Sequence, residues 1–167
     1  LRTFTFGISL VVEKPVMGDF DGDGCTDVAL TRNVGGEQLV MIWYILKSNH
    51  GAYNQYTSLQ FGVPGDLPAA GDFDGDGKSD VAVFRPANGT WYIFRSGSGQ
   101  VQVTQFGSNG DKPQPGDFDG DGKADLGVFR PSEGNWYMWL SGSDTQKIIR
   151  WGLSTDIPVA TMNSLSQ

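Results

Sequence analysis

One ten-residue stretch, which occurs three times, constrains this chain more than any other feature. Residues 18–27, 71–80 and 116–125 all read Gly-Asp-Phe-Asp-Gly-Asp-Gly-x-x-Asp. Counted from the first Asp, each loop has acids at positions 1, 3, 5 and 9 and a Gly at position 6. That Gly permits a sharp reversal of the backbone. Four carboxylates gathered in such a turn repel one another unless a cation lies between them.

Alternating Asp residues in a tight turn aim several hard oxygens at one point, and Ca²⁺ tolerates this crowded geometry better than Mg²⁺. We therefore predict three Ca²⁺ ions, one in each loop. The predicted carboxylate ligands are Asp19, Asp21, Asp23 and Asp27, then Asp72, Asp74, Asp76 and Asp80, then Asp117, Asp119, Asp121 and Asp125.

An EF-hand is the first alternative, because it also begins Asp-x-Asp-x-Asp-Gly. It requires a bidentate Glu at position 12 and flanking helices. Here position 12 holds Leu30, Val83 or Val128, and the residues around it favour a strand. A plain Asp/Gly turn without a metal is the second alternative. The same four acids placed three times argue against it.

The net charge of −7 reflects these loops, which hold 12 of the 19 acidic residues. Three bound Ca²⁺ ions would change the net charge to −1. The acidity therefore does not indicate a basic partner, and the absence of a clustered basic patch argues against nucleic acid. The sequence contains no run of about 18 apolar residues, so no transmembrane helix is expected. Cys25 is the only cysteine, so no disulfide forms within the chain.

A repeat of 45 residues extends beyond the loops. Phe61-Gly62, Phe106-Gly107 and Trp151-Gly152 recur at that interval, as do Trp91-Tyr92 and Trp136-Tyr137. A period of 40 to 50 residues with about four short strands is typical of propeller blades. For the second repeat we predict strands near 67–71, 80–85, 90–96 and 100–106.

The strand patterns favour stacked sheets. Residues 81–84 and 91–94 are apolar on both faces, which requires cover from both sides. Residues 100–105 alternate between polar and apolar, as expected of a half-exposed outer strand. The prediction is an all-β chain of β-propeller-type, four-stranded antiparallel blades. The blade repeats span 8–61, 62–106 and 107–151, with partial flanking strands at 2–6 and 156–160.

The recurring pattern Phe-Gly, Gly-Asp-x-Pro, Gly-Asp-Phe-Asp-Gly-Asp-Gly-x-x-Asp, Phe-Arg-Pro and Trp-Tyr resembles FG-GAP/VCBS repeats over nearly the whole chain. Similar calcium loops occur in integrin α-subunit propellers. The resemblance implies a β-propeller, usually of seven blades, with an ion between the first and second strands of a blade. It also implies backbone carbonyl ligands at position 7 of each loop, which are Cys25, Lys78 and Lys123. Three blades cannot close a ring, so the resemblance predicts a piece of a longer chain, an assembly of copies, or an open stack.

Other repeated residues have simpler explanations. The Trp-Tyr pairs could stack on sugars, but inter-blade core packing is the favoured interpretation. Arg32, Arg85 and Arg130 each follow a loop by five residues, which favours a repeated structural hydrogen bond or ion pair. Asp66, Asp111 and Asp156 each lie two residues before a Pro and are expected in turns.

The leading functional hypothesis is a non-catalytic, secreted or cell-surface calcium-binding repeat module for adhesion or for binding a protein or carbohydrate ligand, in which calcium is structural. One alternative is an accessory or catalytic propeller domain of a secreted polysaccharide-degrading enzyme. Only seven acids remain outside the loops to supply a carboxylate pair. The other alternative is a subunit of an extracellular filament or surface assembly. Self-association, or a place in a longer chain, is expected in every case.

Overall fold

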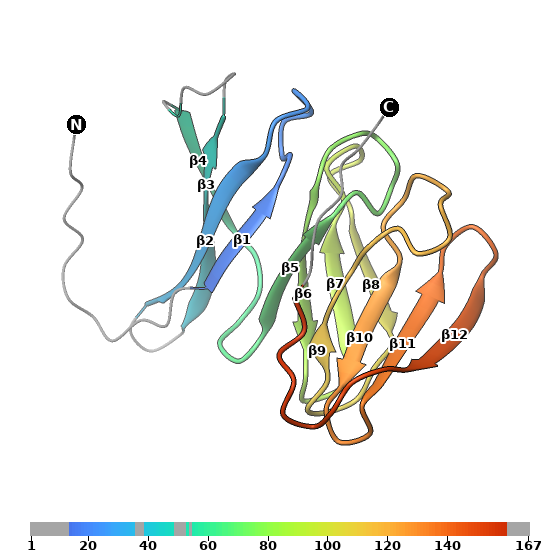
Figure 1. Ribbon diagram of the computed structural model, residues 1–167. Coiled ribbons are helices and arrows are strands. Elements are labelled where there is room, and N and C mark those ends of the chain that lie inside the picture. Colours follow the sequence, from blue (N-terminus) through green and yellow to red (C-terminus); the bar gives the residue numbers. More distant parts are fainter. Residues whose placement is uncertain (1–13, 36–38, 49–52, 54, 160–167) are drawn as a thin grey trace.

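The computed structural model describes residues 14–35, 39–48, 53 and 55–159, and all regular structure in this part is β-strand. The strands form three four-stranded sheets, here called the first, second and third blades (Figure 1). The first blade contains β1 (Lys14–Gly18), β2 (Asp27–Val34), β3 (Val40–Lys47) and β4 (Gln55–Gln60). The second contains β5 (Leu67–Gly71), β6 (Asp80–Arg85), β7 (Thr90–Phe94) and β8 (Val101–Gln105). The third contains β9 (Lys112–Pro113), β10 (Leu126–Arg130), β11 (Asn135–Leu140) and β12 (Thr145–Arg150).

Each blade is an antiparallel meander in which consecutive strands pair as neighbours. The predicted four-stranded antiparallel blades are therefore confirmed, and β5 and β6 have the bounds predicted for them. The expected pattern of the outer strand is also present. β8 alternates between exposed and half-buried residues, whereas every residue of β6 except the last is buried.

The blades pack face to face, and β6 supplies side chains to both of its neighbours. Val81 and Val83 join a core cluster with residues of the first blade, which are Ala29, Met41, Trp43 and Ile45. Ala82 and Phe84 join a second cluster with Leu126 and Val128 of the third blade. Because alternate residues of a strand point to opposite faces, a strand that is apolar on both faces suits a sheet covered on both sides.

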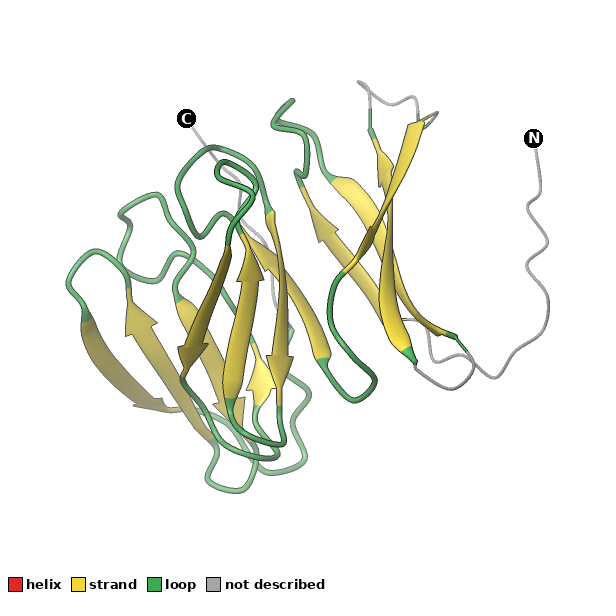
Figure 2. Ribbon diagram, turned by 180° about the vertical axis from the view of Figure 1, so that it is seen from behind, coloured by secondary structure: helices red, strands yellow, loops and turns green. Residues whose placement is uncertain are grey.

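The first strands of the blades lie together, since β1 contacts β5 and β5 contacts β9. This approach also brings two cations near each other. The pKa of the Lys14 ammonium is lowered by burial and, to a smaller extent, by the charge of Lys112. First strands that converge at the inside of the array are typical of propellers. Within the described residues, however, the three sheets form an open stack and do not close into a ring (Figure 2).

The repeated spacing of the Trp residues reflects core packing in two of the three blades. Trp43 and Trp91 are fully buried, and the indole N–H of each donates to a backbone carbonyl at the end of its blade, Phe61 O and Phe106 O, at 3.0 Å. Core packing therefore explains these two residues. Trp136 makes the same bond to Trp151 O at 2.8 Å but is only half-buried, because no further blade covers the third one in the described residues.

Two of the three repeated arginines, Arg85 and Arg130, form the expected ion pairs. Arg85 binds Asp66 through two bonds of 2.8 and 3.0 Å and lies over the Tyr92 ring, 4.3 Å from its centroid. Arg130 repeats the arrangement with Asp111 and Tyr137. Hydrogen bonding to Asp66 raises the pKa of the Arg85 guanidinium. Asp66 also accepts the N–H of Val63 at 3.0 Å, so it shapes a turn as predicted.

Of the two predicted flanking strands, one can be compared with the structure and the other cannot. Residues 2–6 lie outside the described residues. Residues 156–159 are described but belong to no strand, in contrast to the prediction for 156–160. In the second blade the equivalent strand β5 pairs with β6, whereas no described strand pairs with 156–159. Asp156 still forms the turn, accepting the N–H of Leu153 at 2.9 Å.

Replacing Arg85 with Ala should destabilise the fold, because the Asp66 carboxylate is buried and would lose both bonds from the guanidinium. We expect a loss of about 2 kcal/mol, below the range for fully buried pairs because the Arg85 side chain is 29% exposed. Urea unfolding in excess calcium measures this loss. Arg150→Ala, on the exposed strand β12, removes the same charge and should change stability by less than about 0.5 kcal/mol. Equal effects of the two substitutions would contradict the structural role of the pair.

Candidate metal centres

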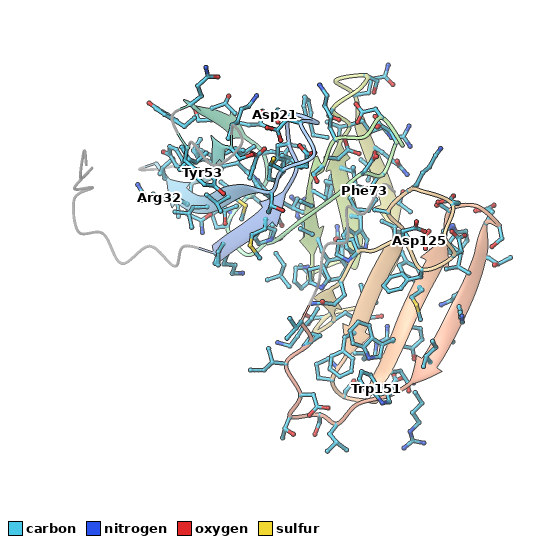
Figure 3. The ribbon with its side chains drawn as sticks, turned by 45° about the horizontal axis from the view of Figure 1, so that its top comes forward. Asp21, Arg32, Tyr53, Phe73, Asp125 and Trp151 are labelled. Atoms are coloured by element: carbon cyan, nitrogen blue, oxygen red, sulfur yellow. The ribbon has the colours of Figure 1, made fainter. Side chains whose placement is uncertain are left out.

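The three acidic loops connect the first and second strands of their blades, and they lie along one side of the stack. Asp21, Phe73 and Asp125, one residue from each loop, are spread along this side, whereas Trp151 lies on the opposite side (Figure 3). Two glycines set the path of each loop. The position-6 Gly predicted from the sequence has a positive φ in all three loops, and so does the Gly at position 4. The φ values are 80° and 80° for Gly22 and Gly24, 79° and 85° for Gly75 and Gly77, and 81° and 87° for Gly120 and Gly122.

The position-1 carboxylate organises the backbone of its own loop. In the second blade, Asp72 Oδ1 accepts the N–H groups of Gly75 and Asp76, and Oδ2 accepts that of Gly77, over distances of 2.7 to 3.1 Å. Asp19 and Asp117 accept the same three bonds in their loops. The loop is thus wrapped around one carboxylate, with backbone dipoles directed toward its charge.

The position-9 carboxylate closes each loop from a buried position. Asp80 is fully buried, and its two oxygens accept the N–H of Phe73 at 3.0 Å and that of Ser96 at 2.6 Å. Phe73 belongs to the loop, whereas Ser96 follows β7, so one carboxylate ties together two connections of the blade. Asp27 and Asp125 do the same in the other blades, with Phe20 and Ser48 and with Phe118 and Ser141 as donors.

Three of the four predicted acids of each loop come together as a cluster. One carboxylate oxygen from each of positions 1, 3 and 9 lies within 4.8 Å of the other two. The clusters are Asp19, Asp21 and Asp27, then Asp72, Asp74 and Asp80, then Asp117, Asp119 and Asp125. Oxygens at this spacing can converge on a single hard cation.

The position-5 acids Asp23, Asp76 and Asp121 are not members of these clusters. Their oxygens accept bonds from the protein itself. Asp76 Oδ1 accepts the N–H of Lys78 at 2.8 Å, and Oδ2 accepts the hydroxyl of Ser96 at 2.9 Å. Cys25 and Lys123 donate equivalent N–H bonds at 2.8 Å in their loops. The carbonyl ligands predicted at Cys25, Lys78 and Lys123 remain predictions.

The electrostatics of the clusters favour a cation. Burial raises the pKa of Asp80, the nearby Asp74 carboxylate raises it further, and the bonds from Ser96 and Phe73 oppose the shift. Ionised Asp80 is therefore costly without a positive partner. In the first blade, Asp21 Oδ1 is shielded from solvent and has no hydrogen-bond partner. A shielded carboxylate oxygen with an open lone pair, on a member of an acidic cluster, fits the coordination of a metal ion.

Residues 97–99 join the strands predicted near 90–96 and 100–106, and their contacts with the loop were not predicted from the sequence. The hairpin after β7 reaches the acids, because the N–H of Gly97 donates to Asp74 Oδ2 at 3.3 Å. Gly142 donates to Asp119 in the same way at 3.1 Å, and the hydroxyl of Ser141 donates to Asp121. The signal in the sequence was the triplet Ser-Gly-Ser at 96–98, which recurs 45 residues later at 141–143.

The fold and the loops define a class of proteins built from stacked, four-stranded β-blades that carry an Asp-rich loop between the first two strands. Residues 19–83 and 72–128 match the FG-GAP-like repeat family. Together these segments span well over half of the chain, which therefore belongs to the FG-GAP-like repeat family. Comparison with curated proteins gave no match, and neither did comparison with solved structures. In the part of the chain that the structure describes, no helix is long and apolar enough to cross a membrane.

Substitution of the closing acid and substitution of the position-3 acid should affect the stability of the fold differently. Asp80→Ala removes the acceptor of the Ser96 N–H, at about 1–3 kcal/mol, and one of the two acceptors of the Phe73 N–H, which also donates to Gly71 O at 3.1 Å. It should therefore lower the stability in calcium and in chelator alike. Asp74→Ala removes a cluster member with less burial, so it should lower the stability mainly in calcium. Urea unfolding of both variants under both conditions tests the difference. Because both acids belong to the cluster, the variants should differ in chelator, where only Asp80→Ala loses stability. An Asp80→Ala variant as stable as the wild type in chelator would contradict the structural role assigned to Asp80.

Proposed function

We propose that this chain is a non-catalytic, calcium-binding repeat module in which each ion stabilises one blade. The observation that carries the proposal is the set of three equivalent carboxylate clusters, each with its acids within 4.8 Å. The buried, unpartnered Asp21 Oδ1 supports it independently. The family resemblance implies calcium rather than another hard divalent ion, and the all-oxygen donor set agrees with it.

The acids at positions 1, 3 and 9 would hold the ion, and those at position 5 and the carbonyls at position 7 would complete its coordination. When bound, the ion supplies positive charge that offsets the repulsion among the clustered carboxylates. The protein's own hydrogen bonds fix the shape of the loop. Asp72 holds the loop backbone, and Asp80 joins the loop to the hairpin after β7. Calcium bound here would therefore stabilise the loop end of a blade.

Extracellular calcium suits such sites, and FG-GAP-like repeats are typical of extracellular proteins. Calcium there is in the millimolar range, so even weak sites fill. We therefore place the protein outside the cell, as a secreted or cell-surface module. Adhesion, or binding of a protein or carbohydrate ligand, is the role that we propose for the array. The alternative of a polysaccharide-degrading enzyme would require a carboxylate pair outside the loops. Of the seven acids outside the loops, Asp66 and Asp111 are already paired with arginines.

Calorimetric titration of the calcium-free chain should give three Ca²⁺ ions per molecule. Excess chelator should lower the midpoint of thermal unfolding, because a ligand that binds only the folded state stabilises it, by about 2.7 kcal/mol per site at a hundredfold excess over its Kd. Asp74→Asn keeps the shape of the side chain but removes one charge from the second cluster, and it should reduce the number of ions to two. Asp144→Asn, outside the loops, is the matched control and should still bind three. An unchanged melting temperature in chelator would rule out the structural role of calcium.

One feature of the surface favours assembly as a second property of this module. Val28 and Leu30 of β2 occupy the places that Val81 and Val83 occupy in β6, where the first blade covers them. Val28 and Leu30 are each 42% exposed. At the other end of the chain, Trp151 is 76% exposed. We propose that a second copy, the rest of a longer chain or another protein covers these surfaces.

In calcium, light scattering of the purified chain should reveal self-association that depends on concentration. The double substitution Val28→Ser and Leu30→Ser should reduce it, because it removes apolar surface from the open face of the first blade. The control is Val101→Ser with Val103→Ser on the outer strand β8, where both valines are also exposed but no blade stacks. A stable monomer at all concentrations, with both ends of the array exposed, would contradict the proposal.

A further inference from the structure

The acidic loops are in direct contact with one another, from each blade to the next. The backbone N–H of Ser79, at position 8 of the second loop, donates to the carbonyl of Asp19, at position 1 of the first, at 2.6 Å. The hydroxyl of Ser79 accepts the N–H of the same Asp19 at 3.1 Å. The third loop repeats the backbone contact, with Ala124 N–H donating to Asp72 O at 2.7 Å. Position 8 of one loop therefore binds position 1 of the loop before it.

A second contact accompanies each of these bonds. The aliphatic part of Lys78, at position 7, lies against Gly22, since a Cβ on Gly22 would be 3.1 Å from Lys78 Cγ. Lys123 lies against Gly75 in the same way, with its Cε 2.9 Å from such an atom. Gly120, the equivalent residue of the third loop, would have nothing within 4 Å. Two loops are thus covered by a lysine of the following blade, and the third is not covered within the described residues.

The burial of the position-1 acids follows the same order. Asp19 is buried, Asp72 is half-buried, and Asp117 is exposed. This acid wraps the loop backbone around its carboxylate and belongs to the carboxylate cluster. A neighbour that fixes its main chain therefore acts on the residue that determines the shape of the whole cluster.

We propose that the residues at positions 7 and 8 of one loop are positioning residues for the metal site of the preceding blade. Lys78 and Ser79 hold the first site in shape, and Lys123 and Ala124 hold the second. The inference rests on the proposed binding of calcium. It adds that each site is completed by the blade after it, so that the affinity of the first loop depends on residues 60 positions away in the sequence. Order imposed on a loop before binding reduces the entropy lost when the ion binds.

Nuclear magnetic resonance can follow each loop separately, through the amide signals of the position-6 glycines Gly24, Gly77 and Gly122. Calcium titration of Ser79→Ala should raise the midpoint for Gly24, because Asp19 N–H loses its acceptor. A hydrogen bond of ordinary strength corresponds to roughly a three- to tenfold loss of affinity. The midpoint for Gly122 should not change, since Ser79 does not touch the third loop in the described residues.

Thr26→Ala is the matched control, since Thr26 holds position 8 of the first loop and none of the hydrogen bonds found for the described residues uses its hydroxyl. It should leave the Gly24 midpoint unchanged. Lys78→Met retains most of the aliphatic contact with Gly22 and serves as a milder second variant, with a smaller shift than Lys78→Gly. Equal shifts at all three glycines, or none at Gly24 in either Ser79→Ala or Lys78→Gly, would overturn the inference. If the wild-type signals of all three glycines fail to respond to calcium, the proposed function itself fails, and that outcome is distinct from the others.

Discussion

The buried carboxylate at position 9 of each loop is the interaction on which the architecture of a blade depends. Asp27, Asp80 and Asp125 are almost completely inaccessible, and each accepts one N–H from its loop and one from a serine within two residues of the end of the third strand. A buried anion requires such donors, because an unpaired buried charge is very unfavourable. Two connections distant in sequence are thereby fixed to one group. The same group contributes an oxygen to the acidic cluster, so the architecture of the blade and the candidate metal site share one residue.

Stacking of the blades stabilises the fold in addition to the hydrogen bonds of these carboxylates within each blade. A single four-stranded sheet with apolar residues on both faces would expose one or both faces to water. Burial of a large apolar side chain contributes about 1.5–3 kcal/mol, and the middle blade buries such residues on both sides, Val83 on one and Phe84 on the other. The ion pair between Arg85 and Asp66 lies within the second blade, where it connects β6 to the turn that precedes β5. Apolar packing therefore holds blades together, while polar pairs fix the turns inside each blade.

The sequence predicted what depends on local pattern. The spacing of Asp and Gly predicted the loops, and the apolar runs predicted β5 and β6 with correct bounds. The contacts of Ser96 and Gly97 with the acids were not predicted, because they arise only after β6 and β7 pair and bring the hairpin over the loop. The contact of Ser79 with Asp19 was also missed, since it depends on how two sheets stack. For residues 156–159 the sequence predicted a feature that the structure does not contain. Their pattern predicted a strand, but a strand requires a partner, and none pairs with them in the described residues.

The two ends of the stack differ chemically, and this difference follows from the direction of the repeat. Each interface joins the loop of one blade to position 8 of the next, so the partners in it are never equivalent. The first blade presents an apolar face with Val28 and Leu30, whereas the third presents the exposed acid Asp117 and the exposed Trp151. A two-fold symmetric contact would join like surfaces, whereas each contact within the stack joins unlike ones. If blades are added to this stack by the contacts already present in it, they are added head to tail, in the heterologous manner that leads either to a closed ring or to an open array.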